Sequence, residues 1–131
     1  MKNTKQQWRK RVEVFRYLYT VMMTGEKQSP LIKKSAFENY LFDNNQTKLI
    51  EYFADNQKEL IKLISDNLAK DWTWERIPEV EKAILLEAVT ESKALNIDRE
   101  IIIDQALVTT KHFSIPSSTK YINAILDKII K

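Results

Sequence analysis

A single glycine in 131 residues, Gly25, is the feature that most restricts the fold of this chain. β-hairpins and tight turns need residues that tolerate a positive φ, and glycine supplies this conformation most readily. A sandwich or barrel with many turns is therefore disfavoured, whereas long helices with few connections fit better. The same scarcity excludes the glycine-rich phosphate loop and the dinucleotide fingerprint, which each need at least two glycines.

The reactive residue types are also few. There is no cysteine, and His112 is the one histidine, which excludes a thiolate nucleophile, a cysteine zinc site and a multi-histidine metal site. Two acid pairs, Glu79/Glu81 and Glu87/Glu91, could in principle do acid–base chemistry. Glu87 and Glu91 are four residues apart on a predicted helix, however, which is typical of a solvated face. We expect no enzymatic activity, no metal site and no cofactor.

Apolar spacing predicts the helices of the first half of the chain. The first spans roughly residues 5–23 and ends at Gly25. Its stripe is Trp8, Val12, Phe15, Tyr19 and Met22. Ser29 is expected to cap a second helix that runs to about Leu41, with apolar residues Ile32, Phe37, Tyr40 and Leu41. Thr47 is expected to cap one long third helix that reaches about Lys70.

The second half begins at a break near residues 71–73. A short helical turn is expected around Glu75 and Arg76, followed by helices over roughly 78–95 and 99–113. Ser117 or Ser118 is expected to cap a last helix, which buries Ile122, Ile125, Leu126 and Ile129. The sequence thus predicts one all-α domain of six or seven helices, with helical subdomains over about 1–71 and 72–131.

Nothing in the sequence predicts a membrane span. No apolar run reaches the roughly 18 residues that a span requires. The N-terminus is polar and basic and lacks the apolar stretch of a signal peptide. We therefore expect a cytoplasmic protein.

The net charge of +3 hides an uneven distribution. Residues 1–34 contain nine basic and two acidic side chains, a formal charge of +7, while residues 35–131 sum to −4. On the first predicted helix, Lys2, Lys5, Arg9 and Arg16 fall within roughly a 60° sector. Such a ridge suits nucleic-acid phosphates. The alternative is a solvated helix face on which Glu13 pairs with Arg9 and Arg16.

Residues 72–85, WTWERIPEVEKAIL, match the pattern W-x-h-[DE]-R-h-x-x-V-[DE]-[KR]-A-I-L, where h is apolar. This segment and four others resemble the NusB family of transcription antitermination factors. Residues 103–106 and 111–113 resemble the family's I-N-E-A and K-x-F, and residues 120–128 resemble K-F-V-N-G-V-L-D-K. Arg9-x-Arg11 followed by Leu18-Tyr19 matches R-x-R…L-Y.

The resemblance implies an all-α fold of two packed helical subdomains and no catalysis. It implies binding of boxA, a short single-stranded element of nascent RNA, together with the small-subunit ribosomal protein NusE. It also implies a place in the antitermination complex of RNA polymerase, which promotes processive ribosomal RNA transcription.

The resemblance also suggests site residues. Arg9 and Arg11 fall on the family's RNA-binding helix, and Tyr121 replaces a phenylalanine near the RNA, where unpaired bases can stack on it. The candidate RNA-binding set is Lys5, Arg9, Lys10, Arg11, Arg16, Ser117, Lys120 and Tyr121. Glu81 takes the position of a contact with the ribosomal partner, and Glu75 lies nearby.

The chain also departs from the family pattern. Asp104-Gln105 replaces Asn-Glu, Leu86 replaces a common arginine, and Thr90 replaces the tyrosine of Y-E-L. These changes leave open whether the partner surface is intact. A helical protein–protein adaptor that has lost RNA binding is therefore the alternative function. The sequence also leaves open whether the free protein is a monomer or a homodimer.

Overall fold

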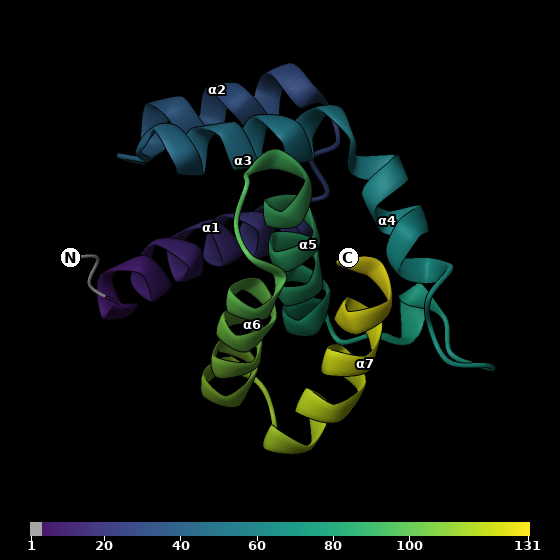
Figure 1. The fold of residues 1–131 in the computed structure, drawn as a ribbon. Helices are drawn as coiled ribbons and strands as arrows, with labels where there is room; N and C mark the ends of the chain where they lie inside the picture. Colours follow the sequence, from purple (N-terminus) through teal and green to yellow (C-terminus); the bar gives the residue numbers. More distant parts are fainter. Residues whose placement is uncertain (1–3) are drawn as a thin grey trace.

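The computed structural model describes residues 4–131, and these residues form helices and loops without a strand (Figure 1). The all-α fold of about seven helices is confirmed. The helices are α1 (Thr4–Thr24), α2 (Ser29–Asn39), α3 (Asn44–Asp55), α4 (Gln57–Ser65), α5 (Glu79–Ala94), α6 (Arg99–Phe113) and α7 (Thr119–Ile129). Two short 3-10 turns, η1 (Trp74–Arg76) and η2 (Pro116–Ser118), precede α5 and α7.

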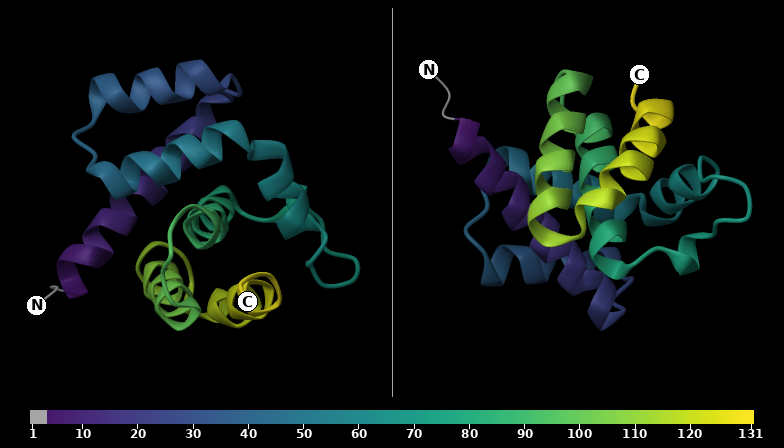
Figure 2. Two further views of the ribbon diagram at one scale, coloured as in Figure 1. Left: turned by 45° about the horizontal axis from the view of Figure 1, so that its top comes forward. Right: turned by 90° about the horizontal axis from the view of Figure 1, so that it is seen from below.

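Helix α5 lies at the centre of the fold. It contacts α1, α3, α4, α6 and α7, and every residue from 81 to 91 is buried. Figure 2 shows α5, α6 and α7 nearly end-on in its left view, with α2 and α3 running side by side across the other part of the molecule. Because α5 contacts helices on both sides of residue 71, one core spans the molecule. The subdomain boundary at that residue stays a prediction.

Two residues with positive φ mark chain reversals. Gly25, at φ 78°, ends α1, and its N–H donates to the Val21 carbonyl at 3.0 Å. Asp71, at φ 70°, lies in the loop between α4 and η1, and aspartate tolerates this conformation better than most residues. The predicted stop at Gly25 and the predicted break near 71–73 are both confirmed.

The predicted third helix was wrong at its start and in its middle. Asp43, not Thr47, caps α3: the Asp43 carboxylate accepts the Gln46 backbone N–H at 2.8 Å, and the Gln46 side-chain oxygen accepts the Asp43 N–H at 2.9 Å. This reciprocal box starts the helix at Asn44. At Asn56 the backbone leaves the α region (φ −132°, ψ 27°), so α3 and α4 are separate helices.

The serines expected to cap helices are used elsewhere. Gln28 occupies the N-cap of α2, and the Ser29 hydroxyl donates to Asp55 at 2.6 Å instead. Ser118 occupies the N-cap of α7, but its hydroxyl donates to Glu81 at 2.7 Å rather than capping the helix. Tertiary acceptors thus replaced the local backbone bonds that the sequence predicted.

The predicted apolar faces were partly wrong as well. On α1, Val14, Tyr17, Leu18 and Val21 are buried. Of the predicted stripe, Phe15 is buried, whereas Trp8, Val12, Tyr19 and Met22 are only half-buried. The buried face is rotated and wider because α1 packs against both α5 and α3. On α2, Phe37 is 88% exposed, and Leu41 beyond its end is fully exposed, so neither belongs to the core.

The Asp43 cap generates a stability prediction. Burial alone would raise the pKa of Asp43, but the Gln46 N–H and the Lys10 ammonium together lower it below the ordinary value. Asp43→Ala is expected to lose about 1 kcal/mol of unfolding free energy through loss of the cap, measured by urea denaturation at pH 7. Asp43→Asn, which keeps an acceptor, should lose less.

The pH dependence separates the charge of Asp43 from its cap. A lowered folded-state pKa stabilises the protein above the ordinary carboxyl pKa, and this stability disappears as the pH falls through the lowered value. The advantage of the wild type over Asp43→Asn should therefore vanish in acid.

The control for Asp43→Ala is Asp66→Ala, which removes an exposed i,i+4 pair with Lys62 and no helix cap. If Asp66→Ala lost as much unfolding free energy as Asp43→Ala, the loss could not be assigned to the cap.

Candidate nucleic-acid interface

The outward side of α1 carries exposed cations. Lys5, Arg9 and Arg16 are exposed and lie on one side of the helix, while Lys2 lies outside the described residues. Arg9 makes no hydrogen bond or ion pair within residues 4–131. Neither predicted pair with Glu13 forms there, because the Glu13 carboxylate accepts a bond from the Gln46 amide at 2.8 Å. The ridge therefore keeps its positive charge facing solvent.

The last turns of α6 lie beside this ridge. The Trp8 indole donates to the Thr109 hydroxyl at 3.0 Å, and its ring lies 4.8 Å from the ring of His112. The Arg16 guanidinium lies over the Phe113 ring at 5.4 Å. These contacts place exposed His112 beside α1.

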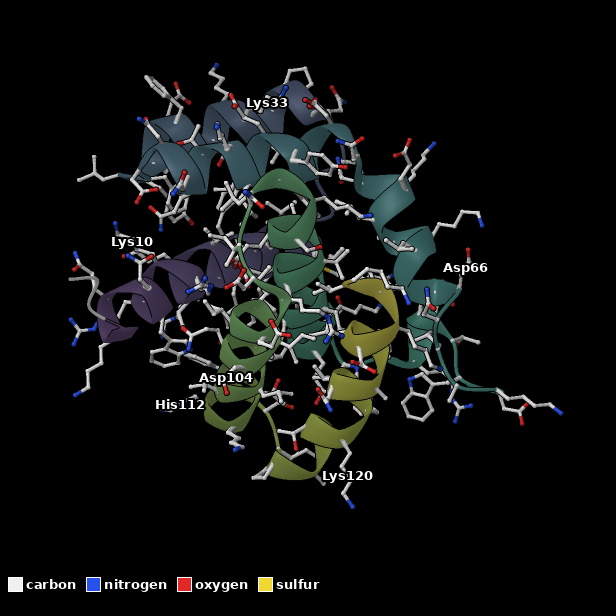
Figure 3. All side chains as sticks on the ribbon, in the orientation of Figure 1. Lys10, Lys33, Asp66, Asp104, His112 and Lys120 are labelled. Atoms are coloured by element: carbon white, nitrogen blue, oxygen red, sulfur yellow. The ribbon has the colours of Figure 1, made fainter. Side chains whose placement is uncertain are left out.

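Sequence reasoning missed His112 as part of this surface. Its motif, Lys111-His112-Phe113, was visible, but only the long-range packing of Trp8 against α6 shows that His112 adjoins α1. In the view of Figure 3, His112 lies between Lys10 on α1 and Lys120 at the start of α7. The exposed surface of α1 thus continues onto the end of α6 at His112.

Lys10 and Arg11 are both paired with acids of other parts of the chain, Lys10 at the surface and Arg11 in the interior. The Lys10 ammonium pairs with Asp43 at 2.8 Å. Arg11 donates through Nε and Nη2 to the Glu91 carboxylate at 2.7–3.1 Å, and through Nη1 to Gln105 at 3.4 Å. The Arg11 side chain is 13% exposed and that of Glu91 is 3% exposed. Arg11 thus joins α1 to α5 and α6, and its guanidinium is already occupied.

The acid pair of α5 is buried, which corrects the expectation of a solvated face. Glu87 is 6% exposed and lies beside Glu91 in the interior. Burial, and then the neighbouring Glu91 carboxylate, raise the pKa of Glu87 well above its ordinary value, although Arg11 opposes the shift. One Glu87 oxygen, Oε2, has no hydrogen-bond partner in the described part of the chain. The acids face inward because α5 is surrounded by helices.

The start of α7 carries a second group of candidates. Ser117 and Lys120 are exposed. Tyr121 is half-buried, and its ring tilts against Trp72 at 6.1 Å. The two rings line a pocket of about 240 Å³ together with Leu68, Ile125 and Lys128. Tyr121 therefore faces the region after α4 rather than α1, so the structure does not bring its ring to the basic ridge.

The two acidic partner candidates differ in exposure. Glu75 is exposed on η1. Glu81 is 2% exposed, and its carboxylate accepts bonds from the hydroxyls of Ser114 and Ser118. It anchors the loop between α6 and α7 to α5, and this inward position opposes direct contact with a partner.

The departures from the family pattern also divide by burial. Leu86 and Thr90 are fully buried, Gln105 is buried beside Arg11, and Asp104 is exposed. The changes at Leu86 and Thr90 therefore lie in the core rather than on a partner surface.

Among the described residues, no group of three His, Asp or Glu side chains is placed to hold a metal ion. No helix there is both long and apolar enough to span a bilayer.

The buried Glu87 generates a pH prediction. An acid with a raised folded-state pKa must take up a proton on folding, so stability falls as the pH rises from the ordinary carboxyl pKa through the raised value. Glu87→Gln removes this titration and keeps the shape of the side chain. The variant should gain stability relative to the wild type as the pH rises, measured by urea denaturation between pH 4 and 8.

Glu51→Gln, at an exposed position of α3, is the matched control and should follow the wild type across this range. A constant difference between Glu87→Gln and the wild type at every pH would contradict a raised pKa for Glu87.

Comparison with known proteins places the chain in a family. The model of the NusB family matches residues 9–131. A "Transcription antitermination protein NusB" of Bacillus mycoides is 36% identical over 118 residues, which cover 86% of this chain and 87% of that protein. The protein of the same name from Fusobacterium nucleatum is 31% identical over 135 residues, with coverage of 92% and 86%.

Solved structures agree with this assignment. T. maritima NusB superposes with a TM-score of 0.75 at 26% identity, covering 94% of this chain and 89% of that one. A conserved hypothetical protein from Mycoplasma genitalium, described as structurally homologous to NusB proteins, gives a TM-score of 0.78 at 22% identity with coverage of 94% and 98%, and it supports the fold alone. The chain belongs to the NusB family.

Proposed function

We propose that this chain is an RNA-binding transcription antitermination factor of the cytoplasm. It binds boxA-type single-stranded RNA together with the small-subunit ribosomal protein NusE, and it acts within the antitermination complex of RNA polymerase to promote processive ribosomal RNA transcription. Support comes from family membership and from curated relatives named for transcription antitermination. The proposal includes no catalytic step and no cofactor.

The exposed basic surface carries the RNA part of the proposal. Arg9 and Arg16 are exposed on α1, whose Trp8 ring contacts His112 of α6, and Arg9 has no acidic partner among the described residues. Clustered cations that face solvent release counterions when they meet phosphates, which favours binding to nucleic acid. Lys5 extends the surface along α1, and Ser117 and Lys120 extend it toward α7.

Three candidates have modified roles in the proposal. Arg11 is held by Glu91 and Lys10 by Asp43, so holding α1 in place fits them better than direct phosphate contact. Tyr121 packs against Trp72. For a base to stack on the Tyr121 ring, the RNA would have to approach it from the side of α4. For NusE, exposed Glu75 stays a candidate contact, because an acidic side chain suits a basic ribosomal protein.

A protein–protein adaptor without specific RNA binding is the second candidate. The occupied guanidinium of Arg11 favours it, because a residue at the matched family position is unavailable to phosphates. Titration of the protein with a boxA-type RNA and with a scrambled RNA of equal length, each with and without NusE, separates the two candidates. The antitermination factor should prefer boxA RNA, most clearly with NusE present. Equal binding of both RNAs in both conditions would leave the adaptor.

The salt dependence of RNA binding tests the individual cations. Each phosphate contact on single-stranded RNA contributes about 0.7 to the slope of log K against log salt concentration. Arg9→Ala should therefore flatten the slope by about 0.7, and Arg16→Ala by a similar amount if Arg16 leaves Phe113 for a phosphate. Arg11→Ala should keep the wild-type slope, although it weakens the fold.

Lys58→Ala is the control, because Lys58 is exposed on α4, away from the surface formed by α1 and α6. It should leave the slope unchanged. An unchanged slope in Arg9→Ala, or a flattened slope in folded Arg11→Ala, would reverse the proposed division between the two arginines.

A further inference from the structure

The exposed imidazole of His112 is held in place by rings from two helices. It lies 4.8 Å from the Trp8 ring of α1, at an interplanar angle of 52°, and 6.4 Å from the Phe113 ring of its own helix. Trp8 is itself fixed, because its indole N–H donates to the Thr109 hydroxyl at 3.0 Å. His112 therefore presents an ionisable group at a defined position beside the basic ridge of α1.

One ring nitrogen of His112 is engaged within the helix. Nδ1 lies 3.2 Å from the carbonyl oxygen of Val108, one turn earlier on α6. Because a carbonyl oxygen only accepts hydrogen bonds, Nδ1 carries the proton of the neutral ring and Nε2 keeps its lone pair. Nε2 has no hydrogen-bond partner within residues 4–131. When the ring takes up a second proton, Nε2–H becomes a charged donor for an anion.

Cations outnumber acids around this ring. The charged groups next to the ring or its aromatic neighbours, and at the adjoining ends of α5 and α7, are Lys5, Arg9 and Arg16 of α1, Lys111 of α6, Lys120 of α7 and Glu81 of α5. Glu81 is bound by two serine hydroxyls, and Glu13 of α1 is bound by Gln46. Neither carboxylate pairs with the imidazole, so a protonated ring has its charge available to an anion from outside.

We propose that protonated His112 is a phosphate contact of the RNA-binding surface, so that the chain binds RNA more tightly as the pH falls below neutrality. This inference rests on the proposed function and adds to its site a residue outside the set that the sequence suggested. Histidine is the side chain that ordinarily gains its charge between pH 5 and 8. The RNA backbone is negatively charged throughout that range, so only the ring changes its charge there.

Protonation of the ring and RNA binding are therefore coupled. In the free protein the neighbouring cations oppose a further positive charge, whereas bound phosphates favour it. RNA should thus make the ring take up a proton in a pH range in which the free protein leaves it neutral. A rise of about one pH unit in the midpoint of protonation corresponds to about tenfold tighter binding in acid than in base.

Titration of the whole chain with boxA-type RNA between about pH 5.5 and pH 8 tests the proposal. The dissociation constant of the wild type should fall about tenfold toward pH 5.5, and the salt slope should steepen by about 0.7, as expected for one added phosphate contact. His112→Gln stays neutral and should lose this pH dependence. His112→Lys is charged throughout and should bind at pH 8 about as tightly as the wild type does in acid.

Two other groups can titrate in the same range, namely the terminal α-amino group and Glu87, whose pKa is raised by burial and by Glu91. Both are retained in His112→Gln, so the difference between this variant and the wild type isolates the imidazole. Lys58→His, made in the His112→Gln protein, is the matched control. It adds a histidine at an exposed position of α4 and should not restore the pH dependence.

NMR gives a readout that a purely structural role would not change. His112 is the one histidine of the chain, so its Cε1–H signal is unambiguous. The midpoint of its pH titration should move upward when boxA-type RNA is bound. A midpoint that stays where it is in the free protein, although RNA is bound, would contradict the contact.

The outcomes separate this inference from the proposed function. A preference for boxA-type RNA with the same pH dependence in the wild type and His112→Gln would overturn the role of His112 and leave the proposed function standing. Equal weakening of His112→Gln at every pH, with an unchanged salt slope, would make the ring a stacking surface for a base and also overturn it. No preference for boxA-type RNA at any pH would overturn both.

Discussion

The Arg11–Glu91 ion pair joins α1 to the buried helix α5, and the direction of the other side chains on α1 depends on it. Three charge-assisted N–H···O bonds of 2.7–3.1 Å link the two groups. Removal of one member of a buried pair typically costs about 3–5 kcal/mol, because the remaining charge stays in the interior without a partner. With Arg11 turned inward, Arg9 and Arg16 lie on the solvent side of the same helix. The inward position of Arg11 thus leaves Arg9 and Arg16 as the exposed arginines of α1.

The interior around this pair contains further polar side chains. Glu87 lies beside Glu91, Gln105 receives a bond from Arg11, and Gln46 links α3 to Glu13 of α1. Such a network specifies one arrangement of helices, because a shifted register would leave several buried polar groups without partners. A defined angle between α1 and α6 follows, and this angle keeps His112 of α6 against Trp8 of α1.

Local patterns predicted most of the helices but few of their faces. The stop at Gly25, the break near Asp71 and the span of α6 depend on residues close in sequence, and the structure confirms them. The inward turn of Glu87 and Glu91 could not be predicted from spacing, because an i,i+4 acid pair looks the same whether a helix is solvated or surrounded. Likewise Phe37 fitted an apolar stripe, yet α2 packs mainly against α3 and leaves that side uncovered.

The candidate site was predictable in composition but not in geometry. The basic character of α1 follows from counting charges, whereas the separation of Arg9 from Arg11 depends on an acid 80 residues further along the chain. The pairing of Tyr121 with Trp72 and the burial of Glu81 under two serine hydroxyls are equally non-local. Arg11, Tyr121 and Glu81 are residue types that suit the predicted roles, but each of these side chains already has a partner within the fold.

We propose that Arg11 holds the fold while Arg9 and Arg16 hold the RNA, and NMR of the arginine side chains during titration of ¹⁵N-labelled protein with boxA-type RNA tests this division. The Nε–H signals of Arg9 and Arg16 should shift strongly, whereas the Arg11 signal should barely move and stay protected from exchange by Glu91. A large shift and loss of protection at Arg11, with an unmoved Arg9, would contradict it.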